Sequence, residues 1–272
     1  MSSFGNSRNS NQQFRQTPRY NVPYKTSNPA LSERRFAERA WDGVGERMTL
    51  EGTANKVGIL LLLCLVSALF TWNQVGITSG GEVYGVGGWL VGGAIGGFIV
   101  ALVTTFKPEW SGVTAPLYAL LEGLFIGGFS ALLEMRYPGI AVQAAGLTFG
   151  VFISLLLAYK TRLIRVTETF RSGLIVAMMG LGLVYLVGFL LRMFSGYQLP
   201  FFQGGIIGIG FSLVVVAIAA ANLLLDFDFI EAAAEEGAPK YMEWYGAFGL
   251  MVTLVWLYIE ILRLLAKLRS DD

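Results

Sequence analysis

Four carboxylates lie inside stretches that are otherwise apolar, and they are the residues best placed to do chemistry. Glu122 lies near the middle of one stretch, Asp226 and Asp228 close another, and Glu260 lies in the last. An ionised acid surrounded by hydrocarbon is costly or becomes neutral, so acids at this depth usually mark routes for ions or protons. We therefore expect an ion or proton pathway.

Spacing separates these acids. Asp226 and Asp228 are two residues apart, about 200° around a helix, so their carboxylates point different ways. Asn222 precedes Asp226 by four residues and shares its face. Asp226 is therefore the candidate for the interior, and Asp228 the candidate for its solvent-side partner. Glu122 has no basic residue within one helical turn, which favours a functional role over a structural ion pair.

A structural reading exists for the other acids. Glu260 and Arg263 are three residues apart and can pair on one helix face. Asp226 and Asp228 can also simply end a helix where water begins. These readings remain open beside the pathway.

The composition excludes most enzyme classes. The 272 residues include no histidine and one cysteine, Cys64, and the net charge is +1. The sequence therefore lacks the residues for Ser-His-Asp catalysis and for Cys/His-rich zinc or iron–sulfur sites. Its net charge also argues against electrostatic nucleic-acid binding. Both intramembrane aspartates lie on one stretch, whereas an intramembrane aspartyl protease needs two facing helices. We predict no catalytic residues, no resident metal and no cofactor.

Seven apolar stretches are long enough to cross a bilayer, whose core needs roughly 20 helical residues. Their continuity predicts helices, because strands of a β-barrel would alternate apolar and polar residues. The fold class is an all-α integral membrane protein, and the lipid bilayer is its first partner. The stretches are 57–77, 83–106, 113–133, 140–159, 173–194, 201–225 and 244–265.

The amino-terminal residues differ in composition from the rest. Residues 1–47 are predicted to form a polar, largely disordered tail, and residues 48–272 the membrane domain. Within the tail, residues 31–47 read equally well as an amphipathic surface segment or as a solvated linker.

Basic residues predict the orientation of the chain. Of 20 Lys and Arg residues, 15 fall on the side of the amino terminus, if the stretches cross in turn. The positive-inside rule then places the amino terminus on the cytoplasmic side of the cell (plasma or inner) membrane. The remaining five include Arg263, Lys267 and Arg269, which follow the rule only if the last stretch is re-entrant. The side of the carboxyl terminus therefore stays open.

Glycines recur at intervals of four residues in three stretches. In lipid, this spacing lets helix backbones approach closely. No glycine-rich phosphate-binding motif accompanies them. We predict helix packing at Gly88, Gly92, Gly96, Gly123, Gly127, Gly204 and Gly208.

Three segments together resemble the Bax inhibitor-1 (transmembrane Bax-inhibitor-motif) family, most closely its bacterial branch with a long polar tail. APLYALLEGLFIGG from Ala115 resembles the family's third segment, and TETFRSG from Thr167 the start of its fifth. LDFDFIEAAAEEGAPKY from Leu225 is similar to its sixth-helix signature and acidic loop.

This resemblance implies a bundle with two three-helix layers around a central carboxyl-terminal helix. It also implies a pH-sensitive calcium leak gated by a carboxylate pair between the last two helices. Alignment places Asp226 on one acid of the pair and Thr253 on the other, so one acid is missing. We hypothesise that Glu122 replaces it, in a path that also includes Asp228 and Asn222.

Three functions follow as hypotheses. The first is a calcium or cation leak, in which oxygen ligands suit calcium ions in transit. The second, implied by the resemblance, is a scaffold that regulates a membrane-anchored ATP-dependent protease or the stress and cell-death machinery. The third, a proton-coupled transporter, would need internal repeats that the sequence does not show convincingly. The oligomeric state is not indicated.

Overall fold

The computed structural model describes residues 46–77, 83–85 and 87–270, so the predicted tail lies almost wholly outside the described residues. Seven helices are long and apolar enough to cross a membrane, one for each predicted stretch. Two-residue strands β1 (Gly76–Ile77) and β2 (Val83–Tyr84) form an antiparallel hairpin, and η1 (Pro108–Trp110) and η2 (Pro200–Phe202) are short 3₁₀ turns. The seven helices are α2 (Leu50–Gln74), α3 (Gly87–Phe106), α4 (Ser111–Arg136), α5 (Ile140–Lys160), α6 (Glu168–Ser195), α7 (Gly205–Glu235) and α8 (Met242–Ser270).

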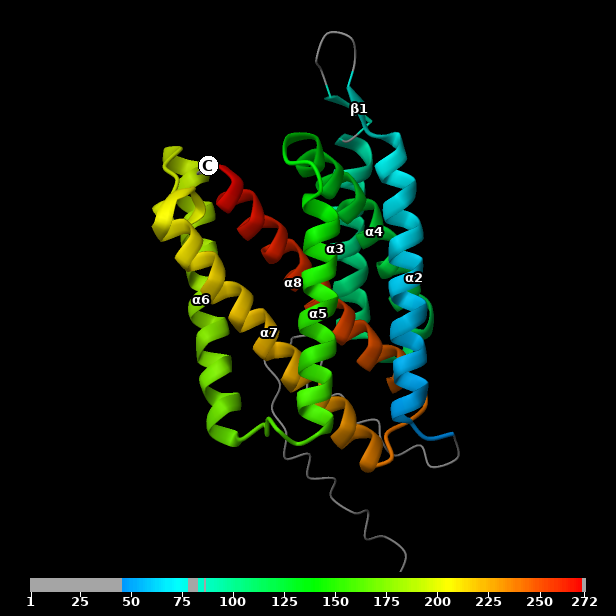
Figure 1. Cartoon of the computed structure of the whole chain (residues 1–272). Helices are drawn as coiled ribbons and strands as arrows, with labels where there is room; N and C mark the ends of the chain where they lie inside the picture. Colours follow the sequence, from blue (N-terminus) through cyan, green and yellow to red (C-terminus); the bar gives the residue numbers. More distant parts are fainter. Residues whose placement is uncertain (1–45, 78–82, 86, 271–272) are drawn as a thin grey trace, which may run out of the picture.

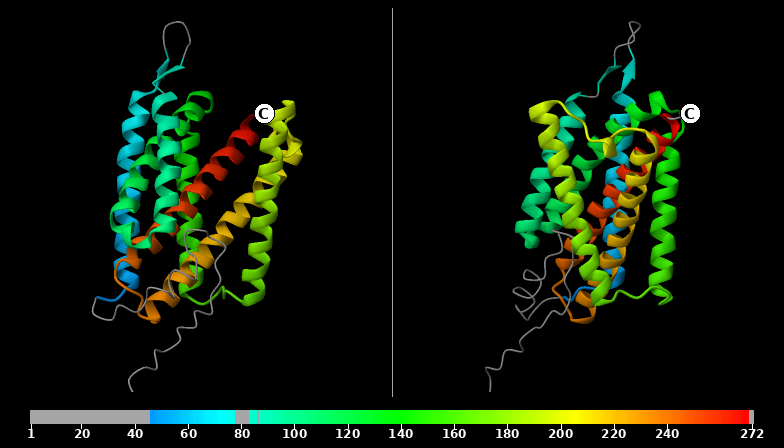
Figure 2. Two further views of the ribbon diagram at one scale, coloured as in Figure 1. Left: turned by 180° about the vertical axis from the view of Figure 1, so that it is seen from behind. Right: turned by 90° about the vertical axis from the view of Figure 1, so that its left-hand side faces the viewer.

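The helices form two groups of three with α8 between them, as Figures 1 and 2 show. Helix α4 packs against α2 and α3, while α7 contacts α5 and α6. Helix α8 touches α2, α4, α5 and α7 and crosses the bundle obliquely. In its most apolar 18-residue window 67% of residues are buried, against 17–39% in the other six helices. The all-α seven-helix fold is therefore confirmed, with the carboxyl-terminal helix at its centre.

The last helix runs the full length of the bundle and is not re-entrant. Helix α8 is continuous over 29 residues. Its end lies at the opposite end of the bundle from the start of α2 (Figure 1). The strict seven-span reading therefore holds, and the side of the carboxyl terminus, open from the sequence, is opposite to the start of α2.

Local sequence explains where several helices begin and end. Thr49 caps α2 by accepting a hydrogen bond from the Gly52 amide at 3.0 Å, and Thr167 caps α6 by accepting one from Phe170 at 3.2 Å. Gly196 ends α6 in the left-handed region, with φ of 68°.

Close helix approach depends on glycines, but not on all those predicted. A Cβ on Gly127 would lie 2.8 Å from the backbone Cα of Ala68 in α2, and one on Gly123 would meet the Cys64 carbonyl. In α3, Gly97 is buried against α4, and a Cβ on Gly96 would lie 3.2 Å from the Leu121 side chain.

The predicted packing of Gly88 and Gly92 was wrong for the described chain. Both are exposed and have open space where a Cβ would stand. The face of α3 that meets α4 is rotated by one residue and carries Gly93 and Gly97 instead. Gly204 is the N-cap residue of α7, so it lies outside the helix it was expected to pack.

We predict that Gly123→Ala together with Gly127→Ala lowers the stability of the protein in detergent. The two methyl groups would push α4 away from the α2 backbone, and such overpacking typically costs about 1–3 kcal/mol. The matched control is Gly146→Ala in α5, which has open space at the Cβ position, and which should be neutral or stabilising because alanine favours helix. Thermal unfolding of both variants tests this, and equal melting temperatures would contradict it.

Candidate functional site

Helices α7 and α8 lie antiparallel, and a polar contact marks each end of their interface. Thr253 contacts Asp226 near one end, and Lys267 contacts Ser212 near the other. The two contacts are 14 residues apart on both helices, about 21 Å. Between them this register places Glu260 level with Ala219. We call this interface the α7–α8 seam: Ser212, Ala219 and Asp226 on α7, with Thr253, Glu260 and Lys267 on α8.

The centre of the candidate site is the hydrogen bond between Thr253 and Asp226. The Thr253 hydroxyl donates to the Asp226 carboxylate at 2.6 Å, and the two residues are 4% and 0% exposed. Asp226 lies nine residues before the end of α7, about 14 Å inside the helix. The structure thus brings together the two residues that the sequence alignment paired, with a neutral hydroxyl in the place of the second acid.

Asn222 lies one turn before Asp226 and is also buried. Its side-chain amide donates to the Ile218 carbonyl of its own helix at 3.1 Å. Asn222 and Asp226 therefore supply neighbouring polar groups on the α7 face, as the four-residue spacing predicted.

Glu260 forms the expected ion pair and one further contact. Its carboxylate lies 3.2 Å from the Arg263 guanidinium. The Tyr185 hydroxyl of α6 donates to the same carboxylate at 2.9 Å and accepts from Arg263 at 3.0 Å. The structural reading of Glu260 as a paired acid is therefore confirmed, and this charge is compensated.

Asp228 belongs to a separate network that faces α5 and α6. Arg171 of α6, itself 4% exposed, donates to Asp228 at 2.6 Å and to Glu168 at 2.8 Å. The Tyr159 hydroxyl donates to Asp228 at 3.3 Å and also to Glu231. Asp228 is thus paired and only half-buried, and it points away from the α7–α8 seam as its spacing from Asp226 predicted.

Glu122 lies with the other helix group. A Cβ on Gly97 of α3 would lie 2.9 Å from a Glu122 carboxylate oxygen, so this glycine leaves room for the acid. Tyr118, one turn earlier on α4, interacts with the carboxylate, and Cys64 of α2 lies nearby. The contacts of Glu122 thus come from α2, α3 and α4, whereas Thr253 of α8 takes the place beside Asp226. These contacts do not support Glu122 as the substitute acid.

A model of a known protein family covers nearly the whole chain. A family model described as Bax inhibitor 1 like matches residues 8–270, nearly the whole chain. The chain belongs to this family. Comparison with curated proteins and with solved structures gives no match.

Sequence reasoning missed one of the three buried acids in the described part of this Bax inhibitor 1 like chain. Glu243, in the first turn of α8, is 0% exposed and contacts Lys56 at 2.6 Å and Lys240 at 3.3 Å. It also accepts hydrogen bonds from the amide and hydroxyl of Thr49, both at 2.9 Å. The Glu243 carboxylate raises the pKa of the exposed Lys240 ammonium. The cluster joins the start of α2 to the start of α8. The one sequence signal for this role was the position of Glu243, between the end of one apolar stretch and the start of the next.

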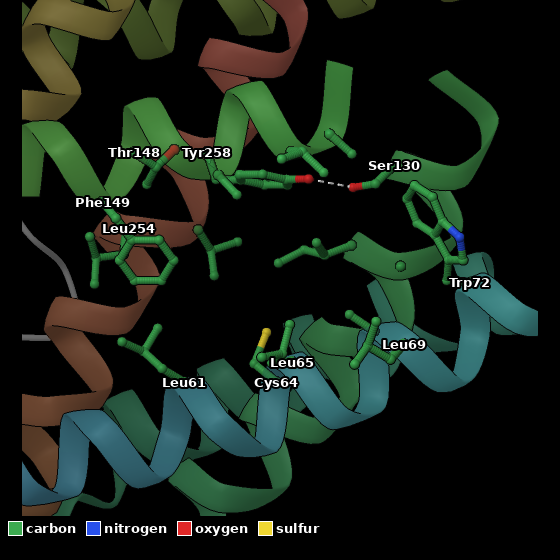
Figure 3. A pocket seen from close by; sticks show the side chains of 17 residues that line it. Leu61, Cys64, Leu65, Leu69, Trp72, Ser130, Thr148, Phe149, Leu254 and Tyr258 are labelled. Atoms are coloured by element: carbon green, nitrogen blue, oxygen red, sulfur yellow. Dashed lines mark hydrogen bonds between the residues drawn. The ribbon is translucent and has the colours of Figure 1, made fainter. Parts of the chain in front are cut away.

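A cavity in the other part of the bundle has the wrong chemistry for an ion path. It measures about 320 Å³ and lies between α2, α4, α5 and α8 (Figure 3). A hydrogen bond of 2.7 Å joins Ser130 and Tyr258 in its wall, and most of its other lining residues are apolar, including Leu65 and Phe149. The α7–α8 seam, and not this cavity, therefore carries the polar groups.

We predict that Thr253→Val destabilises the protein by about 1–3 kcal/mol, because Asp226 loses a buried donor. Thr148→Val is the matched control: Thr148 is equally buried, but its hydroxyl bonds only the Ala144 carbonyl of its own helix, at 2.8 Å. Thermal unfolding in detergent should show a clear loss for the first variant and a small one for the second. Equal losses would mean that the Asp226 contact contributes nothing special.

Proposed function

We propose that the protein is a pH-sensitive cation leak, with calcium as its cargo and the α7–α8 seam as its path. The observation that carries the proposal is the fully buried Asp226, held by a neutral hydroxyl in the most buried part of the bundle. A carboxylate at membrane depth is expensive and is retained mainly where ions or protons pass. Membership of the Bax inhibitor 1 like family is consistent with this function.

The ligand types along the seam suit a hard cation. Calcium takes oxygen ligands, and Asp226, Thr253 and Asn222 offer carboxylate, hydroxyl and amide oxygens within one or two turns. Farther along the seam lie Ser212 and Lys267, whose side chains share a hydrogen bond of 2.9 Å. Polar groups thus mark both ends of a path of about 21 Å.

The pH response would come from a single acid. With one carboxylate at the Thr253 contact, protonation removes the charge that attracts a cation. Two acids sharing a proton would titrate in two steps, whereas an Asp–Thr contact titrates in one. Acid pH should therefore reduce flux, and neutral to alkaline pH should restore it.

The orientation belongs to the same proposal. Fifteen of the 20 basic residues lie in the tail or on the side where α2 begins. The amino terminus would accordingly lie on the cytoplasmic side of a plasma or inner membrane. The three basic side chains near the end of α8 contact protein groups: Arg263 binds Glu260, Lys267 binds Ser212, and Arg269 binds the Pro138 carbonyl.

A second candidate is a scaffold that regulates a membrane protein or the stress and cell-death machinery. The observation that favours it is where the tail joins the bundle. The Met48 amide donates to the Ala238 carbonyl at 2.7 Å, and the Lys240 amide donates to the Glu46 carbonyl at 2.9 Å. A partner bound to the tail would thus act directly on the loop between α7 and α8.

We predict that wild-type protein in liposomes passes calcium faster at about pH 8 than at about pH 6, because the proposal makes the charge of buried Asp226 the feature that admits the cation. Asp226→Asn should lose most of the flux and all of the pH response. Asp228→Asn is the control at a paired acid outside the seam, and it should keep the pH response. A flat profile in the wild type would overturn the leak.

Removing residues 1–29 separates the two candidates. A leak through the seam should keep its flux, since the deletion leaves every seam residue in place. A tail-dependent scaffold should show no flux at any pH and should lose its membrane partner on deletion. Flux assays and co-purification on the same two proteins distinguish the outcomes.

A further inference from the structure

The side chain of Lys267 ends in a cradle of three oxygen atoms. Its ammonium donates to the carbonyls of Phe201 and Gly208, both at 3.0 Å, and to the Ser212 hydroxyl at 2.9 Å. The residue is 7% exposed. An ammonium group has three N–H donors, so these three acceptors use its full capacity.

All three of those acceptors are neutral. In the described part of the chain, no carboxylate forms an ion pair with Lys267, and the charges that act on it along α8 are those of Glu260 and Arg263. A buried ammonium without a counter-ion is normally disfavoured. Carbonyl and hydroxyl oxygens in a ring are instead what proteins use to replace the water of a desolvated cation. The cradle therefore resembles a cation site that a side chain fills.

The local backbone is shaped around this site. The turn η2 presents the Phe201 carbonyl. The ring centroid of Phe202 lies 5.4 Å from that of Tyr185, in a tilted contact, and 5.9 Å from that of Phe211, in an edge-on contact. Gly208 has no side chain, and a methyl there would lie 3.5 Å from the Lys267 nitrogen and would meet the Gln203 carbonyl. Aromatic packing thus supports one carbonyl, and a glycine leaves room at another.

The cradle closes one end of the α7–α8 seam. Ser212 and Lys267 share the register that pairs Asp226 with Thr253, and the two contacts are about 21 Å apart. A cation that moves along the seam from Asp226 must pass the Lys267 ammonium or replace it.

We propose that these three oxygens form a cation site, and that Lys267 fills it as a tethered cation that restrains the leak. This inference rests on the proposed function for its gating part, whereas the binding part stands without it. The chemical class of ligand is a desolvated cation with hydrogen-bond donors or a hard metal cation. Lys267 competes with the passing ion for the same oxygens.

The binding part is tested by chemical rescue. Lys267→Ala leaves the cradle empty, and added propylammonium should raise its melting temperature in detergent, because the probe restores the three carbons and the three N–H donors that the substitution removes. Tetramethylammonium is the control cation, since it carries the charge but has no N–H group. Wild-type protein should respond to neither. If propylammonium raises the melting temperature of the variant no more than tetramethylammonium does, the cation site is overturned.

The gating part is tested by calcium flux in liposomes. Lys267→Gln should raise flux about tenfold or more, as expected for loss of a nearby unit charge in a medium of intermediate dielectric constant. Lys267→Arg keeps the charge and should stay near the wild-type rate. Arg269→Gln is the matched control: it removes a charge two residues away that binds the Pro138 carbonyl and Gln143 outside the seam, and it should leave flux unchanged.

The outcomes separate this inference from the proposed function. If Lys267→Gln is folded and conducts no faster than a conducting wild type, the ammonium is a structural anchor and the gate is overturned. If no variant conducts but propylammonium still stabilises Lys267→Ala, the leak fails and the cation site stands. If Lys267→Gln alone conducts, both the leak and its restraint are supported.

Discussion

The rest of the structure depends on the burial of α8 at the centre of the bundle. In hydrocarbon no water satisfies polar groups, so every polar side chain on this helix must find its partner inside the protein. Glu243 binds Lys56 and Lys240, Thr253 binds Asp226, and Glu260 binds Arg263. Each contact ties α8 to a different neighbour or to itself, so the helix is fixed in rotation and in depth at several levels.

The α7–α8 seam depends on the register in which these two helices pack. Asp226 and Ser212 on α7 are 14 residues apart, as are Thr253 and Lys267 on α8. A shift of one residue would break both end contacts together and would leave a buried carboxylate and a buried ammonium unsatisfied. Polar contacts of this kind specify one packing arrangement. Apolar side chains alone would specify it less sharply.

The fold was largely predictable from the sequence, and the site only in part. Hydropathy located all seven helices because length and apolar content alone decide whether a segment can span a bilayer. Residues on one helix were also correctly related, as with Glu260 and Arg263, because helical geometry fixes their separation. The pairing of Asp226 with Thr253 came from the family resemblance, since helical spacing relates residues within one helix but does not show which residues meet across two helices.

The failures have the same physical origin. Spacing of four residues fits two adjacent faces of α3, and only contact with α4 selects Gly93 and Gly97 over Gly88 and Gly92. Lys267 read as one more basic residue near a helix end, because its three acceptors include two backbone carbonyls. Backbone acceptors carry no sequence signal, so such a site becomes visible only in three dimensions.

An acidic side chain lies at one end of the seam and a basic one at the other, which bears on the proposed leak. In that proposal, Asp226 would attract a cation at one end, and Lys267 would repel one at the other. Glu260 lies between them, but Arg263 compensates its charge. Lys267 lies in the last turn of α8, where the helix dipole favours a positive charge, so its ammonium is held at this end by the helix as well as by the cradle. A cation would thus meet attraction and restraint at separate places about 21 Å apart. Charge at Asp226 and occupancy of the cradle could then be set independently, one by pH and the other by competition for three oxygens.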